Sequence, residues 1–169
     1  YHGFQIWLNM PAKHKLIAPS TAVYQETKMG HLSTDSYTAK IVLGELFGAK
    51  SSIELLSPAF YYHINLKANT QLDIPTDPLH NAMVYVIKGK VELEGQKQLK
   101  VNQVALYERG DSLIGMYTEK EAEVLVLGGL PLNEPVYSYG PFVMNSEEQI
   151  RQCVKDYQSG KMGNPKLVN

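Results

Sequence analysis

Short runs of apolar and β-branched residues, separated by turn residues, constrain the fold of this chain more than any other feature. Seven such runs are rich in Val, Ile, Tyr and Leu: residues 40–46, 59–66, 82–87, 90–93, 101–106, 112–117 and 123–127. Gly89, Gly95 and Gly110 mark reversals between them. Short strands at this spacing are typical of an all-β sandwich or barrel, and no βαβ rhythm runs through them. We therefore expect an all-β fold.

One helix is predicted, near the end of the chain. Ser146 can cap it, and residues 146–149 match a capping box. An apolar face then follows at helical spacing: Ile150, Cys153, Val154 and Tyr157. Cys153 lies on that face, which predicts a buried core thiol rather than a reactive one.

The composition excludes several classes of function. Sixteen basic and seventeen acidic residues leave a net charge of -1, so the electrostatic footprint of a nucleic-acid-binding protein is missing. One cysteine cannot form an internal disulfide, and no apolar run approaches the roughly 18 residues of a membrane span. We expect a reducing, cytoplasmic setting without a membrane partner, or a nuclear one in a eukaryote.

The first residues have the pattern of a strand. Phe4, Ile6 and Leu8 alternate with Gln5, Trp7 and Asn9, and Pro11 ends the run. From Ala12 to about Thr38 the sequence has no sustained periodicity. A connector of this length is unusual inside one compact domain, so it is expected to link two folding units. The chain also starts without an initiator methionine, which suggests a fragment.

Four segments resemble the pirin family of the cupin superfamily: residues 2–13 (HGFQIWLNMPAK), 81–89 (NAMVYVIKG), 128–136 (GGLPLNEPV) and 139–145 (YGPFVMN). The resemblance covers essentially the whole chain. It implies the C-terminal half of a two-cupin protein, folded as a cupin-type jelly-roll β-barrel with one C-terminal α-helix. The implied division is residues 1–10, the last strand of a missing N-terminal cupin; 11–38, a connector; 39–145, the C-terminal cupin; and 146–169, helix and tail.

The resemblance also fixes where a cupin metal site would lie. Such a site needs three imidazoles and one carboxylate, a set that holds Fe(II) or a similar ion with open positions. By resemblance, the carboxylate position is Ala82, the histidine pair would fall within residues 75–79 (PTDPL), and residues 112–123 contain no histidine. We therefore expect no cofactor in this chain, and Fe(II) or a similar metal in the absent N-terminal cupin.

Few polar residues remain as candidates for a site. His63 shares a strand face with Tyr61 and, together with Tyr85, could line a small-molecule cavity, although a polar face of a barrel strand is common without any ligand. His80 is expected in a loop. His2, His14 and His31 are too scattered for a metal cluster. We assign no catalytic residue in this chain.

Two functions follow from the resemblance. The leading hypothesis is a metal-free structural and interaction module that supports an iron-dependent N-terminal cupin, in a parent protein resembling quercetin 2,3-dioxygenases or transcriptional co-regulators. The alternative is that this half itself binds a flavonoid-like ligand or takes part in dioxygenase catalysis. The expected partner is the N-terminal cupin half.

The run from Phe4 to Leu8 raises the question of self-association. A strand whose barrel is absent leaves backbone groups and apolar side chains uncovered. Such a segment can fold back onto its own barrel or pair with the same segment of a second copy, and we favour pairing, as a homodimer through residues 4–8.

Overall fold

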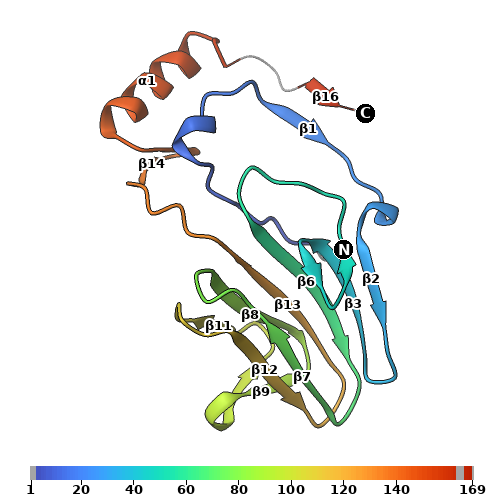
Figure 1. The fold of residues 1–169 in the computed structure, drawn as a ribbon. Coiled ribbons are helices and arrows are strands. Elements are labelled where there is room, and N and C mark those ends of the chain that lie inside the picture. Colours follow the sequence, from blue (N-terminus) through green and yellow to red (C-terminus); the bar gives the residue numbers. More distant parts are fainter. Residues whose placement is uncertain (1–2, 163–165, 169) are drawn as a thin grey trace. The chain divides into compact units, whose positions relative to one another are not determined.

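A computed structural model describes residues 3–162 and 166–168 of the chain. They fall into two compact units, one formed by Tyr24–Pro131 and the other by the residues up to Val23 together with those from Leu132 onward (Figure 1). The described helices include none that is both long enough and apolar enough to cross a membrane.

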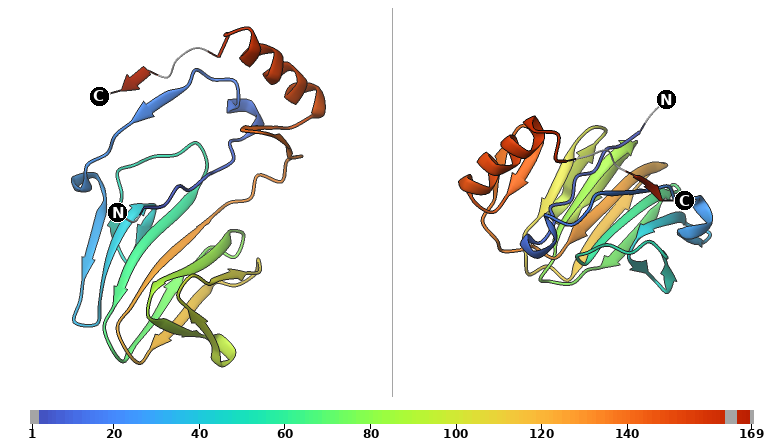
Figure 2. Two further views of the ribbon diagram at one scale, coloured as in Figure 1. Left: turned by 180° about the vertical axis from the view of Figure 1, so that it is seen from behind. Right: turned by 90° about the horizontal axis from the view of Figure 1, so that it is seen from above.

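The unit Tyr24–Pro131 is a sandwich of two antiparallel sheets (Figures 1 and 2). The six-stranded sheet has the order β11 (Val104–Tyr107), β8 (Asn81–Lys88), β13 (Ala122–Gly129), β6 (Ala59–Leu66), β3 (Tyr37–Leu43) and β2 (Gly30–Ser33). The four-stranded sheet has the order β10 (Lys97–Lys100), β9 (Lys90–Leu93), β12 (Leu113–Thr118) and β7 (Thr70–Pro75). A small hairpin pairs β4 (Glu45–Leu46) with β5 (Ala49–Lys50), and 3-10 turns occupy Glu26–Lys28 and Glu94–Gln96.

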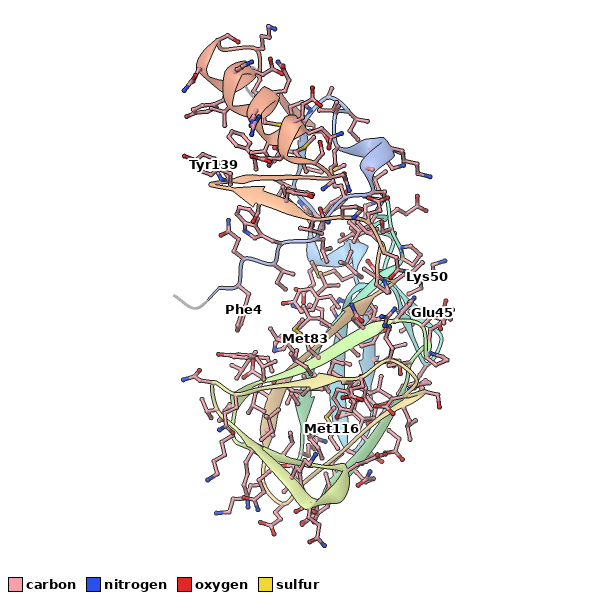
Figure 3. The ribbon with its side chains drawn as sticks, turned by 90° about the vertical axis from the view of Figure 1, so that its left-hand side faces the viewer. Phe4, Glu45, Lys50, Met83, Met116 and Tyr139 are labelled. Carbon is pink, nitrogen blue, oxygen red and sulfur yellow. The ribbon has the colours of Figure 1, made fainter. Side chains whose placement is uncertain are left out.

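Branched aliphatic side chains from both sheets fill the space between them. Ile64, Val84 and Val124 come from the six-stranded sheet, and Ile74 and Ile114 from the four-stranded sheet; all five are fully buried. Met116 of β12 lies in this core, whereas Met83 of β8 is 39% exposed; both are labelled in Figure 3. The β-branched runs in the sequence therefore supply both the strand propensity and the core.

The second unit contains the helix. It comprises a 3-10 turn (Ala12–His14), β1 (Ser20–Ala22), the hairpin of β14 (Tyr137–Tyr139) and β15 (Phe142–Met144), α1 (Glu147–Gln158) and β16 (Lys166–Val168), which runs parallel to β1. Glu134 ties its distant segments together, because its Oε2 accepts hydrogen bonds from Ala12 N at 2.8 Å and from Asn145 Nδ2 at 3.0 Å.

The helix forms where the sequence predicts it. Ser146 is the N-cap, and its Oγ accepts a hydrogen bond from Gln149 N at 3.2 Å. Gln149 Oε1 reaches back to Asn145 N at 2.9 Å, so the capping box closes one residue earlier than its usual form. Ile150 and Cys153 are buried against Met144, which confirms the core position of the thiol.

Most predicted strands are present. The bounds 59–66 and 90–93 are those of β6 and β9, and four further runs match β3, β8, β12 and β13 to within a few residues. The run 101–106 corresponds to β11, which starts only at Val104. The sequence did not predict β2, β7 or β10.

The segment before Tyr37 differs most from expectation. Gly30–Ser33 is β2, an edge strand of the six-stranded sheet paired with β3, so the sheet begins inside the predicted connector 11–38. Residues 3–11 belong to no helix or strand here. The expected strand at 4–8 was assigned to an N-terminal cupin outside this chain, and it stays a prediction. Phe4, Ile6 and Leu8 are all exposed there.

We predict that Gly128→Ala destabilises the protein. Position 128 lies on the inner side of β13, where an added Cβ would overlap the Phe60 ring and the carbonyl oxygen of Asn81. Overpacking of this kind costs about 1–3 kcal/mol of unfolding free energy, measurable by urea denaturation. Gly115→Ala is the control, because its Cβ would meet the Asp73 carboxylate at 3.3 Å, a side chain that can move. Equal stability of the two variants would contradict the prediction.

Candidate functional site

Ala82, the residue at the expected carboxylate position, lies in one cross-strand row on the inner face of the six-stranded sheet. Phe60 of β6 pairs with Gly128 of β13, which pairs with Ala82 of β8, which pairs with Tyr107 of β11. Ala82, at the expected carboxylate position, faces this interior and is buried. The row therefore offers a methyl group and two aromatic rings, and no carboxylate, around the expected carboxylate position.

Aromatic packing fills the Phe60 end of the row. The Phe60 ring stacks on Tyr62 with centroids 5.2 Å apart and on His80 at 6.1 Å. It lies over the backbone of Gly128, where only a residue without a side chain leaves it room. His80, placed by the sequence in a loop, stands just before β8 and so joins this aromatic stack.

The segment 75–79 provides no ligands. Pro75 ends β7, and the loop after it is held by its own contacts: Asp77 Oδ1 accepts from Leu79 N at 2.9 Å, and Pro78 O accepts from Gly110 N at 2.9 Å. Residues 3–162 bring no three His, Cys, Asp or Glu side chains together as a metal cluster. The donor set at the cupin positions does not fit three imidazoles and one carboxylate.

Two polar atoms near this row are buried and lack a hydrogen-bond partner among the described residues. They are the hydroxyl of Tyr107 and Nδ1 of His80. Burial raises the pKa of Tyr107 to about 12, with the carboxylates of Glu94 and Asp111 adding to the effect. The phenol therefore stays protonated, and thus able to donate, throughout the neutral range.

Tyr62 has a raised pKa with a different hydrogen-bonding pattern. Its hydroxyl donates to the backbone oxygen of Glu45 at 2.6 Å. Burial, followed by the charge of Glu45, raises its pKa to about 12. Tyr62 is thus a satisfied core tyrosine, which makes it the natural comparison for Tyr107.

The three predicted cavity residues lie on the outer face of the six-stranded sheet. Along β6 the inner positions Phe60, Tyr62 and Ile64 are buried, so Tyr61 and His63 point outward, as does Tyr85 between buried Val84 and Val86. His63 and Tyr85 flank Leu125 in one cross-strand row, and Tyr61 lies in the next row. The sheet brings the three onto one face but separates them from the barrel interior.

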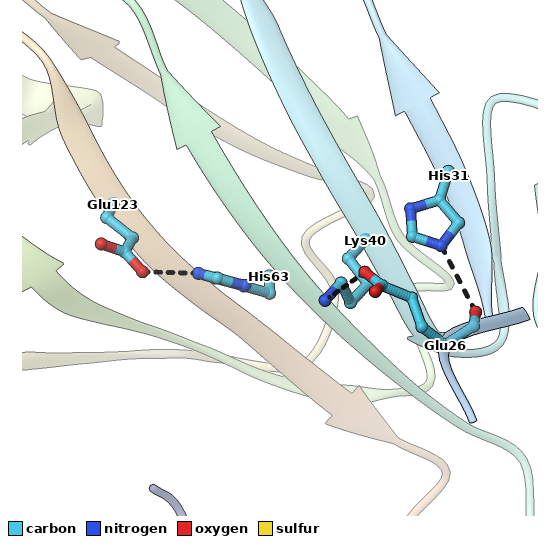
Figure 4. Close-up of polar contacts among 5 residues, drawn as sticks. All are labelled: Glu26, His31, Lys40, His63 and Glu123. Atoms are coloured by element: carbon cyan, nitrogen blue, oxygen red, sulfur yellow. Dashed lines mark hydrogen bonds and ion pairs between the residues drawn. The ribbon is translucent and has the colours of Figure 1, made fainter. Parts of the chain in front are cut away.

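Charged pairs occupy the β2–β3–β6 part of that face (Figure 4). His63 Nε2 is 2.7 Å from Glu123 Oε1, and Lys40 Nζ is 2.7 Å from Glu26 Oε1. The hydrogen bond and charge of Lys40 hold the pKa of Glu26 below its ordinary value. His31 Nε2 lies 3.4 Å from the backbone oxygen of Glu26.

An open depression of about 360 Å³ lies over the same three strands. His31, Lys40 and His63 are among the residues that line it. Lys40 and His63 each already lie 2.7 Å from a carboxylate oxygen of the chain, so the arrangement fits a self-satisfied polar surface. Sequence reasoning found His63 but missed Glu123, Lys40 and Glu26, because these contacts depend on the pairing of strands far apart in the sequence.

The remaining candidates are dispersed. Tyr85 donates its hydroxyl hydrogen to Asn102 Oδ1 at 2.9 Å, at the turn before β11. His14 lies in the 3-10 turn of the other unit, and His2 is outside the described residues. The sequence alone did not single out Phe60 and Tyr107, because they come into one row with Ala82 only when the strands pair.

The fold is that of a cupin. A crystal structure of quercetin 2,3-dioxygenase from Acinetobacter baumannii superimposes with a TM-score of 0.88 at 26% identity, covering 95% of this chain and 56% of that one. A second crystal structure of the same name from that organism gives a TM-score of 0.70 at 16% identity. The second likeness concerns the fold alone.

The sequence identifies the family within that class. Residues 61–163 match the pirin C-terminal cupin domain. Human pirin is 30% identical over 96% of this chain, and a putative quercetin 2,3-dioxygenase of Pseudomonas aeruginosa is 34% identical over 94% of it. The chain belongs to the pirin family. It spans 57% and 58% of the lengths of these two relatives.

We predict that the two buried tyrosines respond oppositely to loss of the hydroxyl. Tyr62→Phe removes a hydrogen bond and leaves Glu45 O without its donor, so it should lower the unfolding free energy by about 1 kcal/mol. Tyr107→Phe removes a buried hydroxyl that lacks a partner, so it should leave stability unchanged or raise it. Thermal and urea unfolding at neutral pH measure both. A loss at Tyr107 as large as that at Tyr62 would show that its hydroxyl is satisfied.

We also predict a loss of stability in strong alkali. Both phenols have pKa values raised to about 12 in the folded protein, against about 10 in an unfolded chain. The neutral form is favoured by folding, so this stability is fully present below pH 10 and is lost as pH rises from 10 to 12. Between pH 10 and 12, the urea concentration at the midpoint of unfolding should fall with pH less steeply for Tyr107→Phe than for the unmodified chain. If the midpoints of both proteins fall equally steeply with pH, the raised pKa of Tyr107 is contradicted.

Proposed function

We propose that this chain is the metal-free C-terminal cupin of a larger pirin-like protein and acts as a structural and interaction module. Its partner is an N-terminal cupin of the same protein, which holds iron or a similar metal. The named relatives support this proposal, because they include pirins and putative quercetin 2,3-dioxygenases that extend well beyond the matched region. The proposed setting is the cytoplasm, or the nucleus in a eukaryote.

One observation carries the proposal. In the inner row Phe60–Gly128–Ala82–Tyr107, the expected carboxylate position is the methyl group of Ala82, and aromatic rings surround it. A barrel whose interior is closed by apolar packing contributes rigidity and surface instead of metal chemistry. The metal-dependent step then belongs to the partner cupin.

Binding of a flavonoid-like ligand by this half is a second candidate function. The buried polar atoms of Tyr107 and His80 favour it, since a ligand hydroxyl could complete their hydrogen bonds. A thermal-shift titration with quercetin tests it. A saturable rise in the unfolding midpoint that is lost in Tyr107→Phe supports binding, and no shift at quercetin saturation rules it out.

We predict that the purified, tag-free chain carries far less than one transition metal per molecule and does not turn over quercetin when Fe(II) is added. The reason is the donor set at the cupin positions, which cannot hold the ion. Elemental analysis and oxygen uptake, compared with buffer containing iron, measure the two properties. A one-to-one metal content that disappears in His63→Ala or His80→Ala would overturn the proposal, as would turnover above the iron control.

A further inference from the structure

The first described residues lie against the hairpin of β14 and β15 within the helical unit (Figure 1). We call residues 3–17 the strap; they include the 3-10 turn Ala12–His14 and belong to the same compact unit as the hairpin and α1. Every residue of the strap is exposed or only partly buried. Packing into a core therefore contributes little to holding the strap in place.

Polar contacts at two points join the strap to the rest of its unit. Glu134 Oε2 accepts a hydrogen bond from Ala12 N at 2.8 Å. Lys15 Nζ donates to the backbone oxygen of Val143 in β15 at 3.1 Å, and also to the side chain of Asn9 within the strap. Hydrogen bonds to a carboxylate or from an ammonium are stronger than those between neutral groups, so a few atoms can hold the whole segment.

The carboxylate of Glu134 is positioned from its other side by the start of the helix. Asn145, the residue before the N-cap of α1, donates from Nδ2 to Glu134 Oε2 at 3.0 Å and to the backbone oxygen of Pro135 at 3.0 Å. The backbone N–H of Asn145 is itself bonded to Gln149 Oε1 of the helix. The acceptor for the strap is therefore held by the junction of hairpin and helix, and its position does not depend on the strap.

We propose that Glu134 and Lys15 form a clasp, and that the strap opens as one piece while the hairpin, α1 and the barrel stay folded. Segments that bury little apolar surface and are held by few hydrogen bonds open in this local way. The strap carries the exposed side chains of Phe4, Ile6 and Leu8. The clasp therefore decides whether this apolar run is held at the hairpin or is free to move away from it.

Hydrogen exchange of the full chain, followed peptide by peptide, tests the clasp. Glu134→Ala removes the acceptor of Ala12 N, so exchange across the strap should become faster by about tenfold, while exchange in β6, β8 and β13 stays unchanged. Trp7, the single tryptophan of the chain, lies in the strap, so its fluorescence anisotropy should fall in the same variant. Lys15→Met removes the second contact and should change both readings in the same direction.

Glu148→Ala is the matched control, because it removes an exposed carboxylate from the first turn of α1 in the same unit; it should leave both readings unchanged. All readings are extrapolated to low concentration, which removes any effect of pairing between copies through residues 4–8. Unchanged exchange of the strap in both Glu134→Ala and Lys15→Met would overturn the proposal. Faster exchange that spreads equally over the hairpin and α1 would also overturn it, because Glu134 would then hold the whole unit together.

Discussion

The register of β13 between β6 and β8 is the constraint on which the rest of this structure depends. It sets Gly128 between Phe60 and Ala82 on the inner face and Leu127 between Tyr61 and Met83 on the outer face. A slip of one residue would exchange the two faces and turn Leu127 and the outward polar residue Glu123 into the core. The same pairing therefore decides which side chains close the interior and which lie on the outer face.

A set of mutually dependent contacts closes the interior of this domain. The Phe60 ring needs Gly128 beneath it, and the stack on Tyr62 and His80 needs the Phe60 ring in that position. These contacts are mutually dependent, so placing a carboxylate at position 82 alone would bury an unpaired charge among rings. The residue at position 82 and the packing of the rings around it are thus constrained together.

The sequence allowed the fold class, the helix and its cap, and most central strands to be predicted, because these depend on local patterns. Alternation along β6 correctly put Tyr61 and His63 on one face, but it could not say which face was buried. The strand Thr70–Pro75 was missed because Gln71 and Asp73 interrupt its short apolar run, and β2 because Gly30 and Ser33 bound it. Glu123 and Tyr107 were missed because their roles exist only after distant strands pair.

The hydrogen bonds of Glu134 have a consequence for how the chain folds. Ala12 is separated from Glu134 by 122 positions, and the whole unit Tyr24–Pro131 lies between them. The helical unit is therefore split in sequence, with the barrel inserted into it. During synthesis its first half must wait until the barrel has been made, and the cost of closing so long a loop falls sharply once that barrel is compact. Folding of the barrel thus shortens the effective length of chain between Ala12 and Glu134.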